Sequence, residues 1–374
     1  MTYRVIQWAT GAMGRSCLQA VIDHPAMELV GLYVYGEKKE GRDAGDIARR
    51  APTGVIATRD VEAILALEAD VVIHCARIAP PYGSHDADIL RLLASGKNVI
   101  SINGYSDPAY WQGTRAEALA AACATGGTTL MAAGLNPGFA AEQLAVVASG
   151  LCSALEHVEV VESVDCRAVR QPDYVFKVLG FGADPARVDA NDPAWGPASS
   201  LNGMYTEVLS AMARHLNLTL ERVDTDHRVF AATDDLVIGA GTIARGTVSH
   251  INWRWHGVVA GQPRLTMSIH WYMEHAHLGG AEPSLWQVKI TGQPDVAIRV
   301  DLVRNAADTA TTSAEQLAVA AMVVNSIPVV CAAPPGLHTR PLATPFRGVL
   351  VPPGRAAVGV PVSPASVSPA PGGR

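Results

Sequence analysis

The sequence predicts an α/β protein: a Rossmann domain with a doubly wound parallel sheet, followed by a second α+β domain with a mostly antiparallel sheet. Apolar runs alternate with helical segments over residues 1–140, as in parallel sheets crossed by helices. A glycine turn follows the first apolar run. Alternating segments bounded by glycine and proline fill residues 228–303, a pattern typical of antiparallel strands.

The first strand, residues 3–9, leads into the turn 10–15 (TGAMGR) and a helix that includes residues 17–22. Glycines allow the backbone to turn sharply, so that its N–H groups and the positive end of the helix can approach a diphosphate. An ordinary tight turn is the alternative. The predicted diphosphate-binding residues are Gly11, Ala12, Met13, Gly14 and Arg15.

The second strand, residues 28–35, completes a nucleotide-binding βαβ unit and bears on the choice of coenzyme. An acid at the end of this strand would bind the adenosine ribose and repel a 2′-phosphate. Here Tyr35 is followed by Glu37 and then by Lys38 and Lys39, so the lysines favour NADP, while Glu37 would favour NAD. A solvated loop is the alternative reading of these charges.

The alternation continues through strands at 70–76, 98–101 and 128–134, with helices at 86–96 and 114–125 between them. The carboxyl ends of parallel strands form the ligand crevice of such sheets. We therefore expect ligand contacts in the loops that begin at Cys75, Ser101 and Leu135.

After Phe139 the pattern changes, and a second domain is predicted over residues 141–313, with a strand at 157–165 and a helix at 204–216. The segment 314–340 begins with a helix too apolar to stand alone, which we expect to return to the Rossmann domain (1–140). Residues 341–374 are rich in Pro, Gly, Ser and Ala and are predicted to form a flexible tail.

The composition limits the function classes. Lys plus Arg number 29 and Asp plus Glu 35, a net charge of −6, which disfavours nucleic acid as a partner. The six cysteines include no C-x-x-C pair, and residues 1–4 do not begin a signal segment, so a cytoplasmic protein with reduced thiols and no membrane association is expected.

Four segments together resemble one family: residues 7–15 (QWATGAMGR), 41–45 (GRDAG), 134–139 (GLNPGF) and 324–328 (VNSIP). Their combination and order resemble the dihydrodipicolinate-reductase-like family, which includes 2,4-diaminopentanoate dehydrogenase and the native NAD(P)-dependent amine dehydrogenases, from Thr2 to about Thr339. The resemblance implies a nicotinamide cofactor in the first domain, a substrate pocket beneath the second sheet, and a homodimer. The His-His pair and the Ser-Gly-Thr turn of true dihydrodipicolinate reductases are absent from the sequence, which disfavours lysine biosynthesis.

Amine dehydrogenases of this family carry adjacent glutamates after the strand that corresponds to 98–101, whereas this sequence has Gly104 and Tyr105 there. Tyr105 is a candidate proton donor or an aromatic wall of the pocket. Glu162 and Asp165, and also Asp107, are candidates to replace the missing carboxylate. The alternative for Glu162 and Asp165 is a solvated sheet face or an ion pair with a nearby arginine.

Further site residues are predicted from the loops and motifs above. Those expected to surround the nicotinamide are Cys75, Ala76, Ser101, Asn103, Asn136 and Asn325. Those expected to line the substrate pocket are Asn136, Pro137, Phe139, Tyr174, Phe176 and His270. Histidines at 270–277 invite a metal interpretation, but the segment lacks an H-E-x-x-H pattern, and no metal is expected.

The predicted function is that of an NAD(P)H-dependent oxidoreductase acting on a C=N bond, formed from a small hydrophobic ketone or aldehyde with ammonia, as in amine dehydrogenases. Two alternatives stay open. One is a carbonyl reductase that works without ammonia, and the other is a catalytically inactive, nicotinamide-binding sensor protein.

Overall fold

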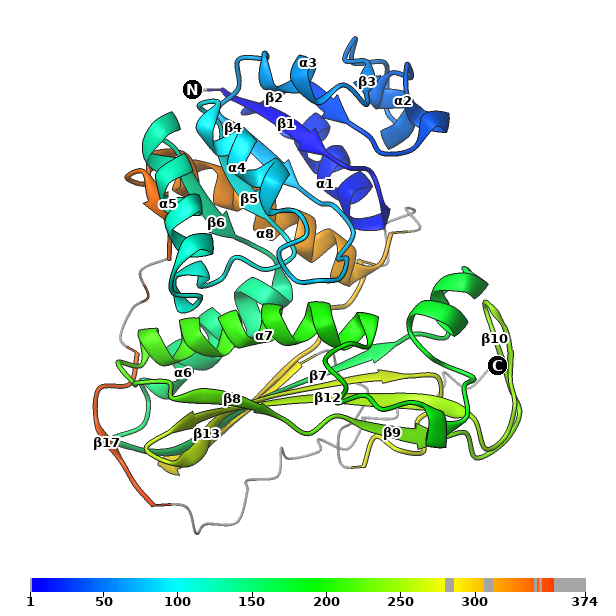
Figure 1. The fold of residues 1–374 in the computed structure, drawn as a ribbon, viewed down its shortest axis with the longest axis vertical. Coiled ribbons are helices and arrows are strands. Elements are labelled where there is room, and N and C mark those ends of the chain that lie inside the picture. Colours follow the sequence, from blue (N-terminus) through cyan, green and yellow to red (C-terminus); the bar gives the residue numbers. More distant parts are fainter. Residues whose placement is uncertain (1, 280–285, 306–311, 340–341, 343–344, 353–374) are drawn as a thin grey trace, which may run out of the picture.

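Two large β-sheets make up the described part of the chain, with helices between and around them (Figure 1). The computed structural model describes residues 2–279, 286–305, 312–339, 342 and 345–352. The first sheet is parallel throughout and has the strand order β16-β6-β5-β4-β1-β2-β3. Its strands are β1 (Tyr3–Trp8), β2 (Met27–Tyr33), β3 (Ala57–Thr58), β4 (Val71–His74), β5 (Asn98–Ser101), β6 (Thr129–Ala132) and β16 (Gly336–Leu337).

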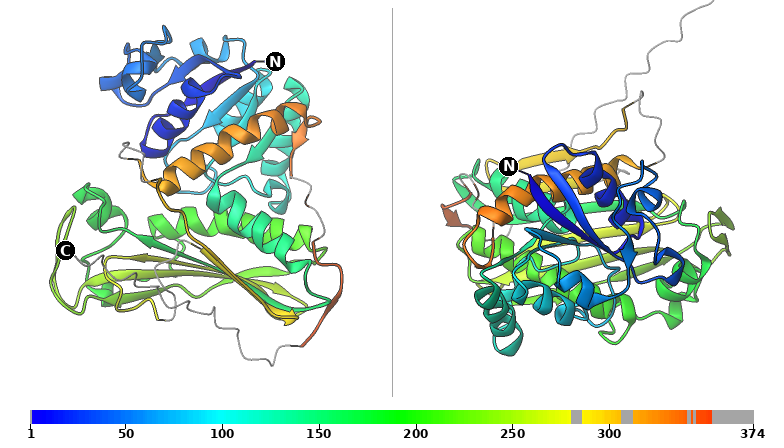
Figure 2. Two further views of the ribbon diagram at one scale, coloured as in Figure 1. Left: turned by 180° about the vertical axis from the view of Figure 1, so that it is seen from behind. Right: turned by 90° about the horizontal axis from the view of Figure 1, so that it is seen from above.

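Helices cover both faces of this sheet, as in a doubly wound fold (Figure 2). One face packs against α1 (Ala12–Asp23) and α8 (Ala314–Ala332), and the other against α3 (Val61–Leu65), α4 (Asp86–Ala94) and α5 (Thr114–Gly126). The short helix α2 (Ala44–Ala48) packs beside α1.

Helix α8 is long and apolar enough to cross a membrane by length and composition alone. In the fold it lies on the first sheet, where Val323, Ile327 and Val330 are fully buried against the central strands. The packing against α1 and the sheet therefore accounts for the buried apolar residues of this helix, whereas Leu317 and Val329 are 40 % and 38 % exposed.

The second sheet is mixed and mostly antiparallel, with the order β15-β14-β7-β13-β12-β8; β9 also pairs with β12, and β17 with β7. Its strands are β7 (Ala154–Asp165), β8 (Arg222–Thr225), β9 (Arg228–Ala231), β12 (Val248–Val259), β13 (Gln262–Tyr272), β14 (Trp286–Gln293), β15 (Val296–Val300) and β17 (Val349–Leu350). Helices η3 (Leu135–Ala145), α6 (Val146–Ser149) and α7 (Gly196–His215) lie between this sheet and the first one (Figure 1). The remaining short elements are η1 (Glu37–Lys39), η2 (Pro108–Tyr110), η4 (Asp173–Val178), η5 (Pro185–Arg187), β10 (Leu236–Ile238) and β11 (Gly241–Ile243).

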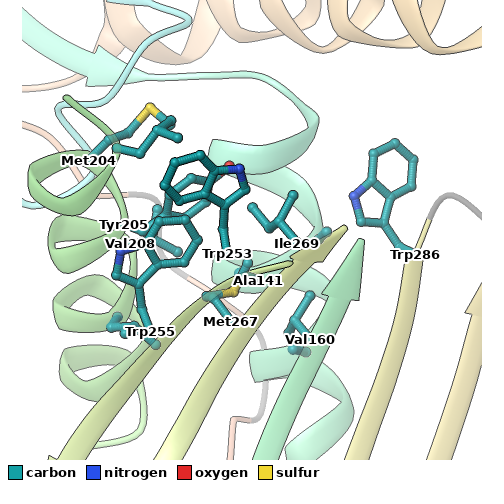
Figure 3. Close-up of a cluster of buried hydrophobic side chains, with 14 of the residues drawn as sticks. Ala141, Val160, Met204, Tyr205, Val208, Trp253, Trp255, Met267, Ile269 and Trp286 are labelled. Atoms are coloured by element: carbon teal, nitrogen blue, oxygen red, sulfur yellow. The ribbon is translucent and has the colours of Figure 1, made fainter. Parts of the chain in front are cut away.

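Side chains alternate between the two faces of the second sheet. Trp253, Trp255 and Ile269 point toward the helices and pack with Tyr205 of α7 (Figure 3). Their burial makes this face the core of the second domain. The next residues along β12 and β13 lie on the far face of the sheet.

The fold class predicted from the sequence is confirmed, with two differences in detail. Helix α7 begins at Gly196 rather than at residue 204, so it includes Gly203. A Cβ at Gly203 would lie 2.4 Å from the Tyr82 ring. Part of the predicted tail is packed: Phe346 is 2 % exposed in the core, and β17 pairs with β7. Residues 353–374 of that tail lie outside the described residues.

Candidate active site

A cleft of about 1040 Å³ opens at the carboxyl edge of the first sheet. Its lining comes from the ends of β1, β2, β3, β4 and β5 and from the segment that leads into η4. The lining residues are Ala9–Gly14, Tyr35–Lys39, Arg59, Cys75–Ile78, Ile102, Asn103, Gln171 and Tyr174.

The glycine turn forms one wall of this cleft. Gly11 caps the N-terminus of α1 and provides no side-chain hydrogen bond to it, so the first N–H groups of the helix remain available to a ligand. A Cβ at Gly11 would meet no atom within 4 Å, whereas a Cβ at Gly14 would come 2.3 Å from the Ala9 carbonyl oxygen. Gly14 is thus required by the close approach of strand and helix, and the space beside Gly11 fits the diphosphate of a dinucleotide.

Positive charge gathers at the end of the cleft formed by β2 and β3. The Lys39 ammonium donates hydrogen bonds to the Thr10 carbonyl oxygen (2.7 Å) and hydroxyl (2.9 Å), which ties it to the glycine turn. Partial burial and the nearby Arg15 and Arg42 guanidinium groups lower the pKa of Lys39. Arg15 itself is exposed on α1 and does not line the cleft.

Two glutamates in this region form ion pairs with an arginine. Arg59, which follows β3 and lines the cleft, lies 3.3 Å from Glu37 and 3.6 Å from Glu40. Tyr35 also lines the cleft, and its hydroxyl accepts a hydrogen bond from the Trp8 indole (3.0 Å). Sequence reasoning missed Arg59 because its strand, β3, is only two residues long.

At the opposite end, the loops after β4 and β5 meet. The Asn103 amide donates a hydrogen bond to the Ala76 carbonyl oxygen and so joins the two loops within the lining. Cys75 also lines the cleft. Ser101 lies beneath the lining, 1 % exposed, where its hydroxyl accepts a hydrogen bond from the Asn103 backbone (3.2 Å).

A second cavity of about 320 Å³ adjoins the cleft and shares Arg77, Ile78 and Tyr174 with it. Aromatic and aliphatic side chains dominate its walls. The other residues that line this cavity are Pro80, Lys177, Val178, Leu179, Trp195, Gly196, Pro197, Ser200, Leu201 and Trp271. Tyr174 was predicted to line the substrate pocket, and it lines this cavity. Trp195 precedes α7 and Trp271 lies on β13, so no local sequence signal indicates that these two tryptophans are neighbours.

Glu162 lies on β7 with 8 % of its surface exposed. It is two residues after Val160, which points toward the helices, and therefore shares that face of the sheet (Figure 3). The Asn136 amide donates a hydrogen bond to its carboxylate, so a residue of the loop after β6 meets a residue of the second sheet. Burial raises the pKa of Glu162 to about 7; the bond from Asn136 opposes this shift, and the negative charge of Glu315 adds to it.

Neither Glu162 nor Asn136 is among the residues that line the two cavities. Tyr174 lines both cavities. Pro137 is buried next to Asn136, and Phe139 packs against the core of the second domain, so both predicted pocket residues lie outside the lining of the two cavities.

Tyr105 does not line the cleft. It is 4 % exposed, and its hydroxyl donates to Asp86 (2.7 Å), which also accepts a bond from Arg115 (2.6 Å). Burial and the adjacent Asp86 raise the pKa of Tyr105 far above its ordinary value. The hydroxyl is committed to a buried network, which does not fit the predicted role as a proton donor.

Asp165 is an exposed residue at the end of β7, where the Arg167 side chain donates to it at 2.9 Å. Partial burial raises its pKa, but the bonds from Arg167 outweigh this and hold the pKa below the ordinary value. The ion pair left open as an alternative is thus present, and Asp165 lies apart from the lining of both cavities. Asp107 is buried elsewhere, where it accepts a hydrogen bond from Ser210 (2.6 Å).

Three further expectations do not match the structure. His270 lies on the far face of the second sheet and bonds His250 (2.9 Å), because β13 turns Ile269 and Trp271 toward the helices. Phe176 packs beside Gly182, outside the lining of both cavities. Asn325 is on the exposed side of α8, since its neighbours in sequence fill the contact with the sheet.

Comparison with known proteins adds to this geometry. Residues 5–79 match the family model for the N-terminal part of dihydrodipicolinate reductase. The chain is 30 % identical over 274 residues to an amine dehydrogenase of Streptomyces virginiae. This match covers 70 % of this chain and 73 % of that protein. It is 28 % identical over 162 residues to a 4-hydroxy-tetrahydrodipicolinate reductase of Synechocystis sp., covering 42 % and 56 %.

Among solved structures, the chain resembles an amine dehydrogenase from Mycobacterium smegmatis, with a TM-score of 0.71 and 19 % identity. The match covers 93 % of this chain and 98 % of that one. A probable dehydrogenase from Thermotoga maritima matches more weakly, with a TM-score of 0.50 and 13 % identity over 89 % and 90 % of the two chains. These two likenesses concern the fold.

Proposed function

Because this chain belongs to the dihydrodipicolinate-reductase-like family that includes the amine dehydrogenases, and is an NAD(P)-dependent oxidoreductase, we propose that it reduces a C=N bond. The bond would be that of an imine or iminium ion formed from a small apolar ketone or aldehyde and ammonia. The observation that carries this proposal is Glu162: a buried carboxyl group, held by Asn136, with a pKa of about 7.

The residues of the larger cleft fit a nicotinamide dinucleotide. Gly11 to Gly14 and the N-terminus of α1 would hold the diphosphate, and Cys75, Ala76 and Asn103 would surround the nicotinamide. Lys38, Lys39 and Arg59 would face the adenosine ribose, where their positive charge supports a preference for NADP over NAD. When bound, the reduced nicotinamide supplies a hydride.

Glu162 would manage charge and protons during reductive amination. As a carboxylate it would stabilise an ammonium or iminium cation, and as a carboxylic acid it would donate a proton to the hydroxyl group of the carbinolamine formed from the carbonyl compound and ammonia, whose C–O bond then breaks to release water. A pKa near the operating pH makes both forms available. The Asn136 amide orients the carboxylate by its hydrogen bond.

The adjoining cavity would hold the carbon skeleton of the substrate. Its volume of about 320 Å³ and its walls of Ile78, Leu179, Trp195 and Trp271 favour a small hydrophobic molecule.

The test is oxidation of NADPH and NADH with a panel of small ketones and aldehydes, each with and without ammonium. Turnover that requires ammonium is expected, and it should fall by about 100-fold or more in Glu162→Gln. Glu159→Gln is the matched control, because Glu159 lies on the same strand but on the other face, 3.7 Å from Lys289.

Equal turnover with and without ammonium would instead identify a carbonyl reductase. Intact cofactor binding without any turnover would favour the non-catalytic sensor. The homodimer and the cytoplasmic location stay predictions.

A further inference from the structure

A cluster of metal-ligating side chains lies beneath the cofactor cleft, apart from its lining. His74 ends β4, and His85 and Asp88 lie at the start of α4. Each offers one ligand atom, and these atoms all lie within 4.8 Å of one another. Neither the proposed cofactor site nor the proposed chemistry uses any of the three.

His74 is the most telling member of the cluster. Its side chain is 1 % exposed, and among the described residues neither of its ring nitrogens has a hydrogen-bond partner. Leaving a buried polar nitrogen unpaired is unfavourable, so such groups usually have a ligand or partner. A cavity of about 10 Å³, lined by both His74 and His85, lies against the rings and has room for one small ion or water.

His85 has the arrangement typical of a metal ligand. One ring nitrogen, Nε2, bonds the Arg77 carbonyl oxygen at 2.9 Å. A backbone carbonyl in this position fixes the tautomer and leaves the lone pair of Nδ1 for a metal, as in many zinc sites. The half-buried Asp88 carboxylate is the third group of the cluster.

We propose that His74, His85 and Asp88 bind one divalent transition metal ion, zinc, with water completing a tetrahedral site. Two imidazoles and one carboxylate suit zinc, whereas magnesium and calcium prefer oxygen ligands alone. Ligand atoms around tetrahedral zinc lie about 3.3 Å apart, since each bond is about 2.0 Å long. Small rotations of the half-buried His85 and Asp88 side chains would bring their ligand atoms closer to this separation.

The place of this site in the fold gives the ion a structural role. The loop between His74 and His85 contributes Arg77, Ile78 and Pro80 to the two cavities described above. An ion that joins both ends of this loop would hold the cavity walls in place. This inference is independent of the proposed function. It differs from the sequence analysis, which expected no metal.

The experiment measures zinc binding by the full-length protein after treatment with a chelator, by competition with a chromophoric zinc indicator. The variants are His85→Ala and Asp88→Asn, whose side chains are half-buried at the start of a helix. Asp46→Asn is the matched control, because Asp46 is an exposed aspartate in the first turn of α2, in the same domain. Circular dichroism verifies that each protein is folded.

Stoichiometric binding is expected in the wild type and in Asp46→Asn, with an affinity at least about 100-fold weaker in both site variants. Cobalt bound to the wild type should show the visible absorption of a tetrahedral site without a thiolate charge-transfer band, although Cys75 is adjacent in sequence. Equal zinc binding by all four proteins would overturn the proposal, as would a wild type that binds no stoichiometric zinc. If one site variant does not fold, the other variant and the cobalt spectrum decide.

Discussion

Glu162→Gln is expected to change how the stability of the protein depends on pH. Burial raises the pKa of this carboxyl group from 4.5 to about 7 in the folded protein. A folded-state pKa above the unfolded one means that the native state keeps a proton which the unfolded chain has already released. Stability therefore falls as the pH rises through this range.

The size of the effect follows from the pKa difference. A pKa that moves from 4.5 to about 7 corresponds to about 3 kcal/mol, since each pH unit between the two values contributes about 1.4 kcal/mol. The wild type should lose this amount between about pH 4.5 and 7, and no more above it. The glutamine has no proton to lose, so its stability should show none of this decrease.

The assay is urea-induced unfolding of both proteins, without cofactor, in steps from about pH 4.5 to 8. Contributions from all other titrating groups cancel in the difference between the two proteins. Glu162→Gln should gain stability relative to the wild type as the pH rises, whatever its constant difference at low pH. Parallel profiles would refute the argument, because they would place the proton of Glu162 in ordinary, solvated surroundings.

The remaining predictions concern the cofactor cleft and the buried tyrosine. Lys38→Glu should raise the KM for NADPH by about 10-fold or more while changing that for NADH much less, in steady-state kinetics with both coenzymes; equal effects would contradict the proposed 2′-phosphate site. Gly14→Ala should weaken cofactor binding in a fluorescence titration and cost about 1–3 kcal/mol in urea unfolding, since its Cβ would come 2.3 Å from the Ala9 carbonyl oxygen. Tyr105→Phe should cost about 1–2 kcal/mol through the lost bond to Asp86 while leaving kcat within about threefold, and a far larger loss of kcat would restore Tyr105 as a proton donor.

The first sheet was predictable because its signals are local. The turn around Gly11 and Gly14, the apolar runs and the carboxyl-edge rule together place the cleft, and Cys75, Ala76 and Asn103 lie in it. Arg59 was missed because a strand of two residues has no periodicity to recognise. Glu37, Lys38 and Lys39, which line the same end of the cleft, were predicted because they follow the longer strand β2.

For the second sheet, the sequence predicts where the strands lie but not which side chains of each strand face the helices. Glu162 and Asp165 are an odd number of residues apart, so the alternation of a strand puts them on opposite faces, and only one of them can point toward the helices. Sequence alone does not tell which one, because a shift of one residue reverses every side chain. For the same reason His270 was predicted to line the pocket, whereas its neighbour Trp271 does so in the structure.

The return of α8 to the first sheet affects how the chain is made. Val5, Ile73, Ile100 and Met131 are in place after about a third of synthesis, but the helix that covers them comes near the end of the chain. Strand β16, at the edge of the same sheet, follows still later. Until α8 is made, only α1 covers this face of the nucleotide-binding sheet, so part of it stays exposed, and a fragment that ends after β6 should aggregate.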